Sequence, residues 1–298
     1  MKNSGILAAL GAYVLWGLLP IYWKLVQQVS ALEIVAHRMV WSLVFALALL
    51  ALTRSWDWLG RVRARPALAL PFVVTGALIF TNWLVYIWAV NHGHIVDASL
   101  GYFINPLVNV LLGVVFLRER LRVGQWVAVA VALAGVSYLT WSLGQLPWIA
   151  LFLAFSFGVY GLVRKTATLA SLEGFTLETG FMSLPAAVIL AVLAARGELA
   201  FGHQGPATSA LLAFTGVITA VPLLLFAVGA RRVTLTTLGI LQYVAPTMQF
   251  LLGVVVYGEA FPLPRLVGFS LVWTSLAIYT LDSYRTLRRR EQVALAGP

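Results

Sequence analysis

Long apolar runs dominate the chain, and none of them alternates apolar and polar residues as a β-strand would. A helix needs about 20 mostly apolar residues to cross a bilayer, and each run approaches or exceeds that length. The pattern predicts ten membrane-spanning helices, over residues 5–26, 33–52, 69–91, 98–117, 124–142, 147–163, 175–195, 208–230, 235–257 and 264–284. We therefore expect an all-α integral membrane protein with short connections.

Composition supports this class and excludes several others. Of the 298 residues, 61% are hydrophobic and 10% are charged, whereas soluble domains carry about 25% charged residues. The chain has no Cys, which excludes disulfides, a thiolate nucleophile, an iron–sulfur cluster and a zinc–thiolate site. Lys2 precedes an apolar run as in a signal peptide, but the run continues past Trp16 without a small-residue cleavage site. We expect a retained first helix.

The net charge of +10 has a directional pattern. If the ten helices are traced in order, all but four of the 20 Lys and Arg residues fall on one side of the membrane, which is typical of the cytoplasmic side. The pattern predicts a multi-pass protein of a bacterial-type inner membrane with both termini in the cytoplasm. Because these basic residues are spread over every inner loop, we expect no nucleic-acid partner. The four exceptions are Lys24, Arg38, Arg196 and Arg265.

A repeat is visible at an offset of 140 residues. Residues 106–119 (PLVNVLLGVVFLRE) align with 246–259 (PTMQFLLGVVVYGE), which matches a Pro, the string LLGVV and a Glu. These segments are the fourth and ninth predicted helices, so the repeat unit has five helices and the second copy is inverted in the membrane. The predicted units are 1–145 and 146–298, within one membrane domain. Inverted repeats are typical of transporters that expose one central site alternately to the two sides.

Four segments resemble the drug/metabolite transporter superfamily, and within it the EamA-type proteins of the RarD group. They are Ala12–Lys24 (AYVLWGLLPIYWK), Glu33–Phe45 (EIVAHRMVWSLVF), Ala98–Glu119 (ASLGYFINPLVNVLLGVVFLRE) and Leu238–Glu259 (LGILQYVAPTMQFLLGVVVYGE). The resemblance covers nearly the full chain. It implies a permease of drugs or metabolites, is specific for the family, and is weak for the substrate.

Two basic residues lie inside the first two predicted helices, where a charge needs a partner. Lys24 shares a helix face with Trp16 and Pro20, and it either extends to the lipid headgroups or contacts substrate. Arg38 cannot lose its charge, and Glu33 is a candidate partner for it. Either this pair locks helices together, or Arg38 and Lys24 bind a substrate carboxylate or phosphate.

Two further residues follow Glu33 on the same face of the second helix, His37 and Trp41. His37 either carries a proton near neutral pH or packs as a hydrogen-bonding core residue. Trp41 is a candidate aromatic surface for substrate.

Polar side chains also recur at helical spacing in later helices. They are Asn82 and Tyr86, then Tyr102, Asn105 and Asn109, then Tyr160, and then Gln242, Tyr243 and Gln249. Pro106 and Pro246 fall within two of these stripes, and each of them, like Pro20, removes a backbone hydrogen bond and is expected to bend its helix. The stripes either bury interhelical hydrogen bonds or line a central substrate cavity.

Carboxylates inside the predicted helices are few. Glu178 is the clear case and lies near the inner edge, which makes it, with His37, a candidate for ion coupling. Glu119 and Glu259 match across the repeat at opposite membrane faces, where they either satisfy helix ends or act in gating. His92, His94 and Asp97 form a weak metal pattern, written HxH with a nearby Asp, and we expect no metal site.

Together these features predict a secondary carrier of a small organic metabolite, anionic or zwitterionic, working by alternating access. The alternative is an exporter of neutral or cationic drugs through an aromatic-lined cavity. An enzyme is not expected, because no nucleophile–base or metal constellation is present, and a channel is also less expected. No nucleotide-binding motif is present, and we expect no cofactor. Expected partners are the small-molecule substrate and the lipid bilayer. Transport direction, ion coupling and the choice between monomer and homodimer stay open.

Overall fold

The computed structural model describes residues 2–54, 56–118, 121–230, 232 and 241–296, and these are helical throughout, with short connections. The elements are α1 (Lys2–Leu25), α2 (Ala31–Thr53), α3 (Trp58–Ala64), the 3₁₀ turn η1 (Pro66–Ala69), α4 (Leu70–Asn91), α5 (Ile95–Leu117), α6 (Val123–Leu143), α7 (Trp148–Thr166), α8 (Ser171–Ala195), α9 (Pro206–Ala230), α11 (Val244–Leu251), the π turn η2 (Leu252–Val256) and α12 (Leu263–Ala296). The all-α class predicted from the sequence is confirmed.

Most of these helices have the dimensions of membrane spans. In the described part of the chain, eight are long and apolar enough to cross a bilayer, and two shorter apolar helices cover Trp148–Arg164 and Val244–Val256. The predicted helix 235–257 falls partly outside the described residues. The predicted connection 53–68 is not a plain loop, because it contains α3, whose Trp58 is buried against the core.

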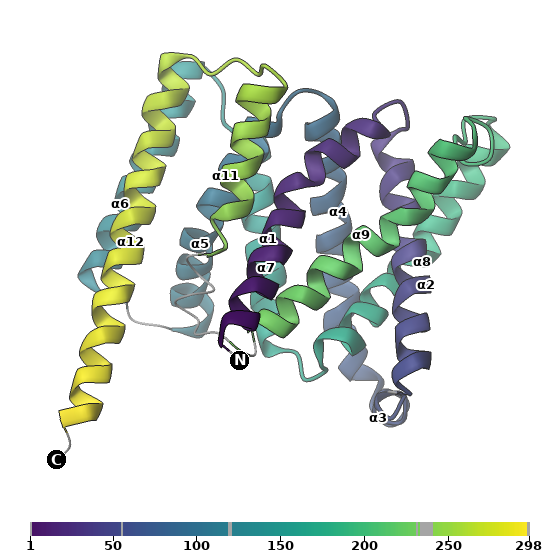
Figure 1. The fold of residues 1–298 in the computed structure, drawn as a ribbon, viewed down its shortest axis with the longest axis horizontal. Coiled ribbons are helices and arrows are strands. Elements are labelled where there is room, and N and C mark those ends of the chain that lie inside the picture. Colours follow the sequence, from purple (N-terminus) through teal and green to yellow (C-terminus); the bar gives the residue numbers. More distant parts are fainter. Residues whose placement is uncertain (1, 55, 119–120, 231, 233–240, 297–298) are drawn as a thin grey trace.

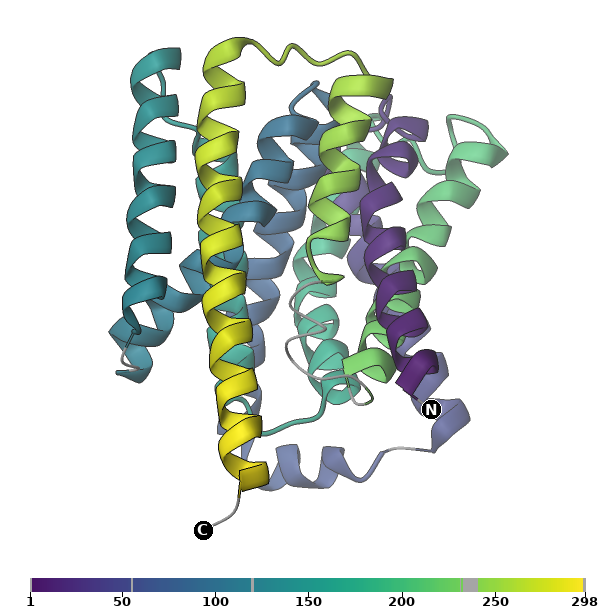
Figure 2. The same cartoon turned by 60° about the vertical axis from the view of Figure 1, so that its left-hand side comes forward.

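The helices stand side by side in one bundle (Figure 1), and the two termini lie at the same end of it (Figure 2). α3 lies at that end as well. At one edge α6 and α12 pack against each other, and the small Gly135 and Gly268 allow their close approach. In the rest of the bundle α1 packs on α9, α4 on α7, α2 on α8, and α5 on α7.

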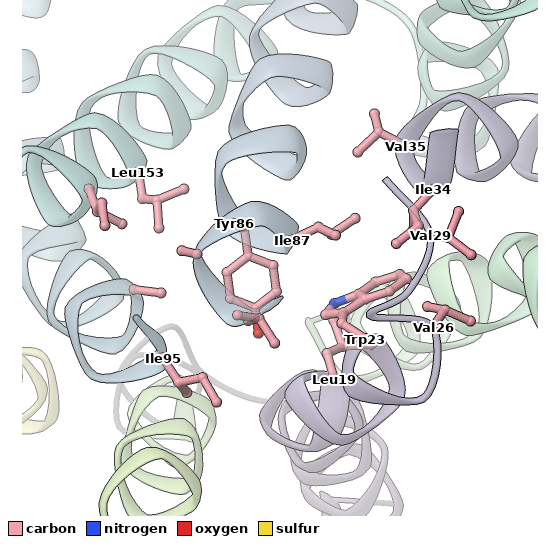
Figure 3. Packing of buried hydrophobic residues seen from close by; sticks show 14 of the residues in the cluster. Leu19, Trp23, Val26, Val29, Ile34, Val35, Tyr86, Ile87, Ile95 and Leu153 are labelled. Carbon is pink, nitrogen blue, oxygen red and sulfur yellow. The ribbon is translucent and has the colours of Figure 1, made fainter. Parts of the chain in front are cut away.

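The largest buried cluster lies where α1, α2, α4 and α5 meet (Figure 3). Trp23 is fully buried and Tyr86 is 2% exposed. In Figure 3 both rings lie among aliphatic side chains such as Leu19 and Ile87. Two large amphipathic rings inside this core bring polar N–H and O–H groups to the middle of the bundle, where each needs a partner.

The three prolines expected to bend helices differ in position. Pro20 lies within α1 and Pro106 within α5, and both helices continue past the proline. Pro246 instead lies in the first turn of α11, where proline is tolerated because that backbone N–H has no intrahelical partner. The π turn η2 follows directly after α11, and such turns often occur at functional sites.

Candidate functional site

Arg38 of α2 is the buried cation of the bundle core, with 4% of its surface exposed. Its Nε donates a hydrogen bond to Thr219 Oγ1 on α9 at 2.8 Å. The guanidinium carbon lies 3.5 Å from the centroid of the Trp83 ring and 5.2 Å from that of Trp23. In the part of the chain that the structure describes, Nη1 is buried and has no hydrogen-bond partner.

The hydroxyl that Arg38 contacts is held in place by its own helix. Thr219 donates its proton to the carbonyl of Thr215 at 2.8 Å, so the oxygen is left to accept from Arg38. The contacts of Arg38 are therefore a neutral acceptor and two indole faces. A cation–π contact contributes about 0.5–2 kcal/mol, less than an ion pair with good geometry inside a protein.

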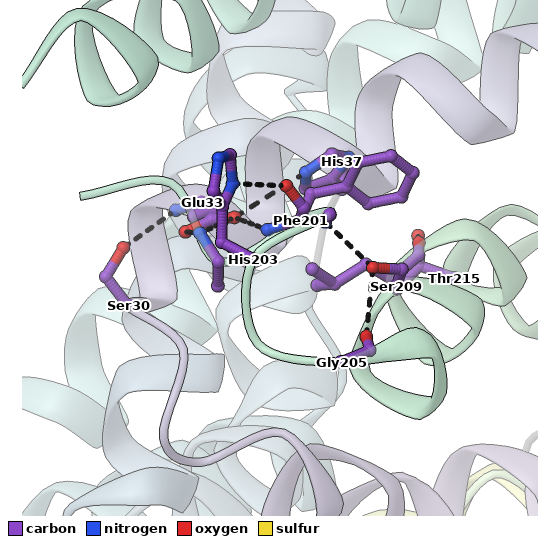
Figure 4. A network of polar contacts seen from close by, with 11 residues as sticks. Ser30, Glu33, His37, Phe201, His203, Gly205, Ser209 and Thr215 are labelled. Carbon is purple, nitrogen blue, oxygen red and sulfur yellow. Dashed lines mark hydrogen bonds and ion pairs between the residues drawn. The ribbon is translucent and has the colours of Figure 1, made fainter. Parts of the chain in front are cut away.

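Glu33 does not serve as the counter-ion that the sequence suggested for Arg38. Its carboxylate accepts hydrogen bonds from the backbone N–H of Ala200 at 2.9 and 3.1 Å and from that of Phe201 at 3.0 Å (Figure 4). Glu33 thus holds the connection between α8 and α9 against the start of α2. The five-residue spacing to Arg38 is a poor helical pairing, whereas two free N–H groups in a turn suit both carboxylate oxygens.

His37 and Trp41 face the same connection. The His37 Nε2 atom lies 3.7 Å from a Glu33 oxygen, and its ring lies 4.7 Å from the Phe201 ring, centroid to centroid. Trp41 is 6.4 Å from Phe201. Phe201, which the sequence pattern did not single out, is the ring that brings both residues together.

A row of aromatic rings crosses the bundle between α4, α5 and α7. Tyr86 contacts Tyr102 at 5.6 Å between ring centroids, Tyr102 contacts Phe157 at 6.4 Å, and Phe157 contacts Tyr160 at 5.6 Å. Both Tyr86 and Tyr102 interact electrostatically with Arg38 at one end of the row. Among the described residues the Tyr86 hydroxyl has no hydrogen-bond partner. We call these four residues the aromatic row.

At the other end of the aromatic row lies Glu178 of α8, which is 1% exposed. The Tyr160 hydroxyl donates to Glu178 Oε2 at 3.5 Å, and Arg164 Nη1 lies 3.6 Å from Oε1. Arg164 was not singled out from the sequence as a site residue. Its position 14 residues before Glu178, the same spacing as Lys24 before Arg38, was an available signal.

Comparison with known proteins identifies the family. The EamA-like transporter family model matches residues 3–141. Protein RarD of Streptomyces exfoliatus is 48% identical over 100% of this chain and 95% of its own length. The chain belongs to the EamA-like transporter family, in its RarD group. It is therefore a multi-pass bacterial membrane transporter of small molecules.

Other EamA-like relatives and one solved structure extend this comparison. An uncharacterized transporter of Pseudomonas aeruginosa is 44% identical over 97% of both chains, and the chloramphenicol-sensitive protein RarD of the same species is 35% identical over 97% of this chain and 98% of its own. One crystal structure aligns over 96% of this chain and 99% of its own, with a TM-score of 0.57 and 21% identity. At that identity the likeness shows the fold alone.

The two asparagines of the transporter's polar stripes use their amide N–H groups for helix packing. Asn82 Nδ2 donates to Leu153 O at 3.1 Å and to Ser156 Oγ at 2.8 Å. Asn105 Nδ2 donates to Ala154 O at 3.1 Å. These contacts tie α4 and α5 to α7, which is the packing alternative that the sequence left open.

Lys24 lies apart from the contacts of Arg38. Its Nζ donates to Asn91 O at 3.5 Å and lies 5.5 Å from the centroid of the Tyr257 ring. The Trp16 ring lies 5.8 Å from that of Phe226. A basic wall that joins Lys24 and Arg38 is therefore not formed by direct contact.

The second polar stripe is also engaged in packing. Gln249 Nε2 donates to the backbone carbonyl of Trp16 at 3.1 Å, which ties α11 to α1. The Tyr243 side chain is in hydrogen-bonding contact with Gln242 and Thr280.

Glu259 satisfies a helix end. Its two oxygens accept from the backbone N–H groups of Ile95 at 2.7 Å and Val96 at 2.8 Å, in the first turn of α5. Its repeat partner Glu119 lies outside the described residues. In the outer loop His94 Nδ1 is 3.2 Å from Asp97 Oδ2, and Arg265 is 3.5 Å from the same oxygen. Each of these groups has a protein partner.

Proposed function

We propose that this transporter is a secondary carrier that moves a small organic anion or zwitterion across the bacterial inner membrane by alternating access. The observation that carries the proposal is the environment of Arg38. Its guanidinium is buried, its contacts are a hydroxyl and two indoles, and Nη1 is without a partner among the described residues.

The energetic argument concerns uncompensated charge. Leaving one member of a buried ion pair without its partner costs about 3–5 kcal/mol. A protein keeps such a group where a ligand completes the pair, and a planar guanidinium suits a carboxylate or phosphate. Trp83 and the aromatic row next to Arg38 would contact the apolar part of the ligand. A small anion with an apolar or aromatic body fits these groups best.

We further propose ten membrane helices arranged as two inverted five-helix repeats, 1–145 and 146–298. The starts of matched helical elements support this arrangement, because they fall 140 residues apart. The matched starts are Ala31 and Ser171, Pro66 and Pro206, and Val123 and Leu263.

The packing pattern supports the same proposal. α1 packs on α9 as α7 packs on α4, and α5 packs on α7 as α11 packs on α1. These pairs interchange if each helix is replaced by its repeat partner. Two equivalent halves around one site are the architecture that alternating access requires. Both termini lie at the end of the bundle that carries α3 with its Arg61 and Arg63, which supports a cytoplasmic location for that end (Figure 2).

The test is ligand-induced thermal stabilisation of the purified full-length protein in detergent. The probes share one ring and differ in charge: benzenesulfonate, phenylalanine, benzyltrimethylammonium and benzamide. A ligand at one hundred times its Kd adds about 2.7 kcal/mol to folded-state stability. We expect stabilisation by benzenesulfonate or phenylalanine that is lost in Arg38→Met. Arg61→Ala, which removes a largely exposed charge, is the matched control.

Two results would contradict the proposal. One is unchanged stabilisation by anionic probes in Arg38→Met. The other is stabilisation by benzyltrimethylammonium or benzamide alone, which would favour the export of cationic or neutral drugs along the aromatic row.

A further inference from the structure

Glu178 and Glu33 are both buried carboxylates at 1% exposure, but their surroundings differ. Glu33 accepts three hydrogen bonds from backbone N–H groups at 2.9 to 3.1 Å. Glu178 has a hydrogen bond to Tyr160 at 3.5 Å and a cation at 3.6 Å, and Oε1 accepts no hydrogen bond from the described residues. Its contacts are long for a charge-assisted interaction, which normally spans about 2.7–2.9 Å.

A buried carboxylate is stable as an anion only when close donors replace its lost hydration. The groups that face Glu178 are Arg164 and Tyr160 from α7 and Thr75 from α4. In the described part of the chain α2, which also packs on α8, adds no charged side chain to this contact. Such an environment holds the anion loosely, so the carboxylate can take up a proton without the loss of a strong hydrogen-bond network.

Arg164 lies in a space that a glycine leaves open. A Cβ on Gly174 would overlap Arg164 Nη1 and the edge of the Phe72 ring. The guanidinium carbon of Arg164 lies 5.3 Å from the centroid of Phe72, and 18% of the side-chain surface is exposed. Arg164 therefore combines an aromatic face, partial access and a loose counter-ion.

We propose that Glu178 is a proton-binding site and that its protonation frees Arg164 to bind the anionic group of the substrate. This inference rests on the proposed function, because it assigns Arg164 to the same ligand as Arg38. The proton adds to one oxygen of the carboxylate and makes Glu178 neutral. Arg164 keeps its charge and exchanges Glu178 for the substrate anion. When the anion leaves, Glu178 releases the proton and pairs with Arg164 again.

The placement of the two sites supports the sequence of events. Arg38 lies at one end of the aromatic row, and Glu178 with Arg164 lies at the other. An anion that leaves Arg38 and moves along this row meets Arg164 at the far end. One proton then accompanies each anion, so the transport of a monovalent anion would be electrically neutral.

The first test needs no ligand. Thermal stability of the full-length wild-type protein and of Glu178→Gln is measured in detergent between about pH 5 and 9. Stability depends on pH wherever the folded and unfolded states bind different numbers of protons. We expect the difference between the two proteins to change with pH, and the difference between wild type and the control Glu173→Gln to stay constant. A constant difference for Glu178→Gln would overturn the proposal.

The second test adds benzenesulfonate, which stays anionic at every pH used. We expect wild type to bind this probe about tenfold more tightly at the acidic end of the range, because one charge-assisted contact is gained. Glu178→Gln should bind at the tighter level at every pH, and Arg164→Gln should lose the pH dependence. A wild-type affinity that does not vary with pH would overturn the proposal.

Gly174→Ala supplies a variant that leaves Glu178 unchanged. Its new methyl group displaces the Arg164 guanidinium, so the pH dependence of benzenesulfonate binding should weaken as it does in Arg164→Gln. The two proposals fail separately. If benzenesulfonate binding is insensitive to Arg38→Met while the ligand-free difference for Glu178→Gln varies with pH, the proton site stands and the assignment of Arg38 falls.

Discussion

Arg38 and Glu178 occupy matching places in α2 and α8 and have opposite environments. Arg38 follows Ala31, the first residue of α2, by the same seven positions that separate Glu178 from Ser171, the first residue of α8. Arg38 contacts indole rings and a hydroxyl, whereas Glu178 has Arg164 beside it. In the first half the residue that matches Arg164 is Lys24, which carries the same sign as Arg38 and contacts Asn91 instead.

The comparison teaches how a near-symmetric bundle can acquire a direction. The Arg38 environment has a standing positive charge, because its half supplies no counter-ion to the described contacts. The Glu178 environment neutralises itself. An anion is therefore attracted at one end without any preceding step, and at the other end only after the internal pair opens.

The largest expected effect comes from reversal of the charge in the first environment. Arg38→Glu places a carboxylate among Trp83, Trp23 and Thr219, where indole faces and a hydroxyl also suit a cationic ligand. We expect benzenesulfonate affinity to fall about a hundredfold or more and benzyltrimethylammonium to become a ligand. Thermal shifts with both probes measure the change. Retained affinity for the anion would show that Arg38 does not contact it.

Removal of the charge sharpens the same contrast from the side of stability. Arg38→Met keeps much of the side-chain volume and removes a buried cation that lacks a counter-ion, so unfolding should become no easier, and by up to about 1–2 kcal/mol harder. Glu178→Met leaves Arg164 without its partner and should destabilise the fold. Thermal melts of the two variants without ligand measure the difference. Equal destabilisation by both would mean that Arg38 is already compensated.

A second matched pair lies at the helix starts, where Glu33 and Glu173 occupy equivalent positions in α2 and α8. Glu33→Ala leaves the buried N–H of Ala200 and the neighbouring N–H of Phe201 without an acceptor, and should lower the free energy of unfolding by about 2 kcal/mol. Denaturation of the variant and wild type in the same detergent checks this value. A loss below that of a surface substitution would show that water replaces the carboxylate.

Close helix contacts provide a smaller effect. A Cβ on Gly216 of α9 would overlap the backbone carbonyl of Trp41 in α2, whereas one on Gly76 of α4 would lie 3.1 Å from the Glu178 carbonyl oxygen and from the flexible Met182 side chain. Gly216→Ala should destabilise the protein by about 1–3 kcal/mol, and Gly76→Ala by less. Thermal melts of both variants rank them, and the reverse order would contradict the packing described.

The smallest effect is expected at Glu173. Its partner Arg61 is 57% exposed, and their 3.2 Å contact lies near the surface. Pairs of this kind contribute about 0–1 kcal/mol. Glu173→Gln should therefore change thermal stability little, and the change should shrink further in high salt. A large loss would indicate that Glu173 secures the end of the bundle as firmly as Glu33 secures the other.

Sequence reasoning located helices well and their polar partners poorly. The predicted runs 33–52 and 69–91 correspond closely to Ala31–Thr53 and Pro66–Asn91. By contrast, the counter-ion suggested for Arg38 was Glu33, and the structure gives Arg38 a hydroxyl on α9 instead. Asn82 was marked for substrate, yet its amide N–H groups bond to α7.

The sequence by itself determined the helical class, the family and the 140-residue offset between its halves. It could do so because a membrane helix is a local property of about 20 residues, and lipid leaves each one little alternative to satisfying its backbone internally. Only the tertiary structure decided which polar groups meet. Arg38 and Thr219 are 181 positions apart, and Glu33 and Ala200 are 167 apart. No local periodicity encodes contacts at that separation, because helix packing alone sets which faces turn toward each other.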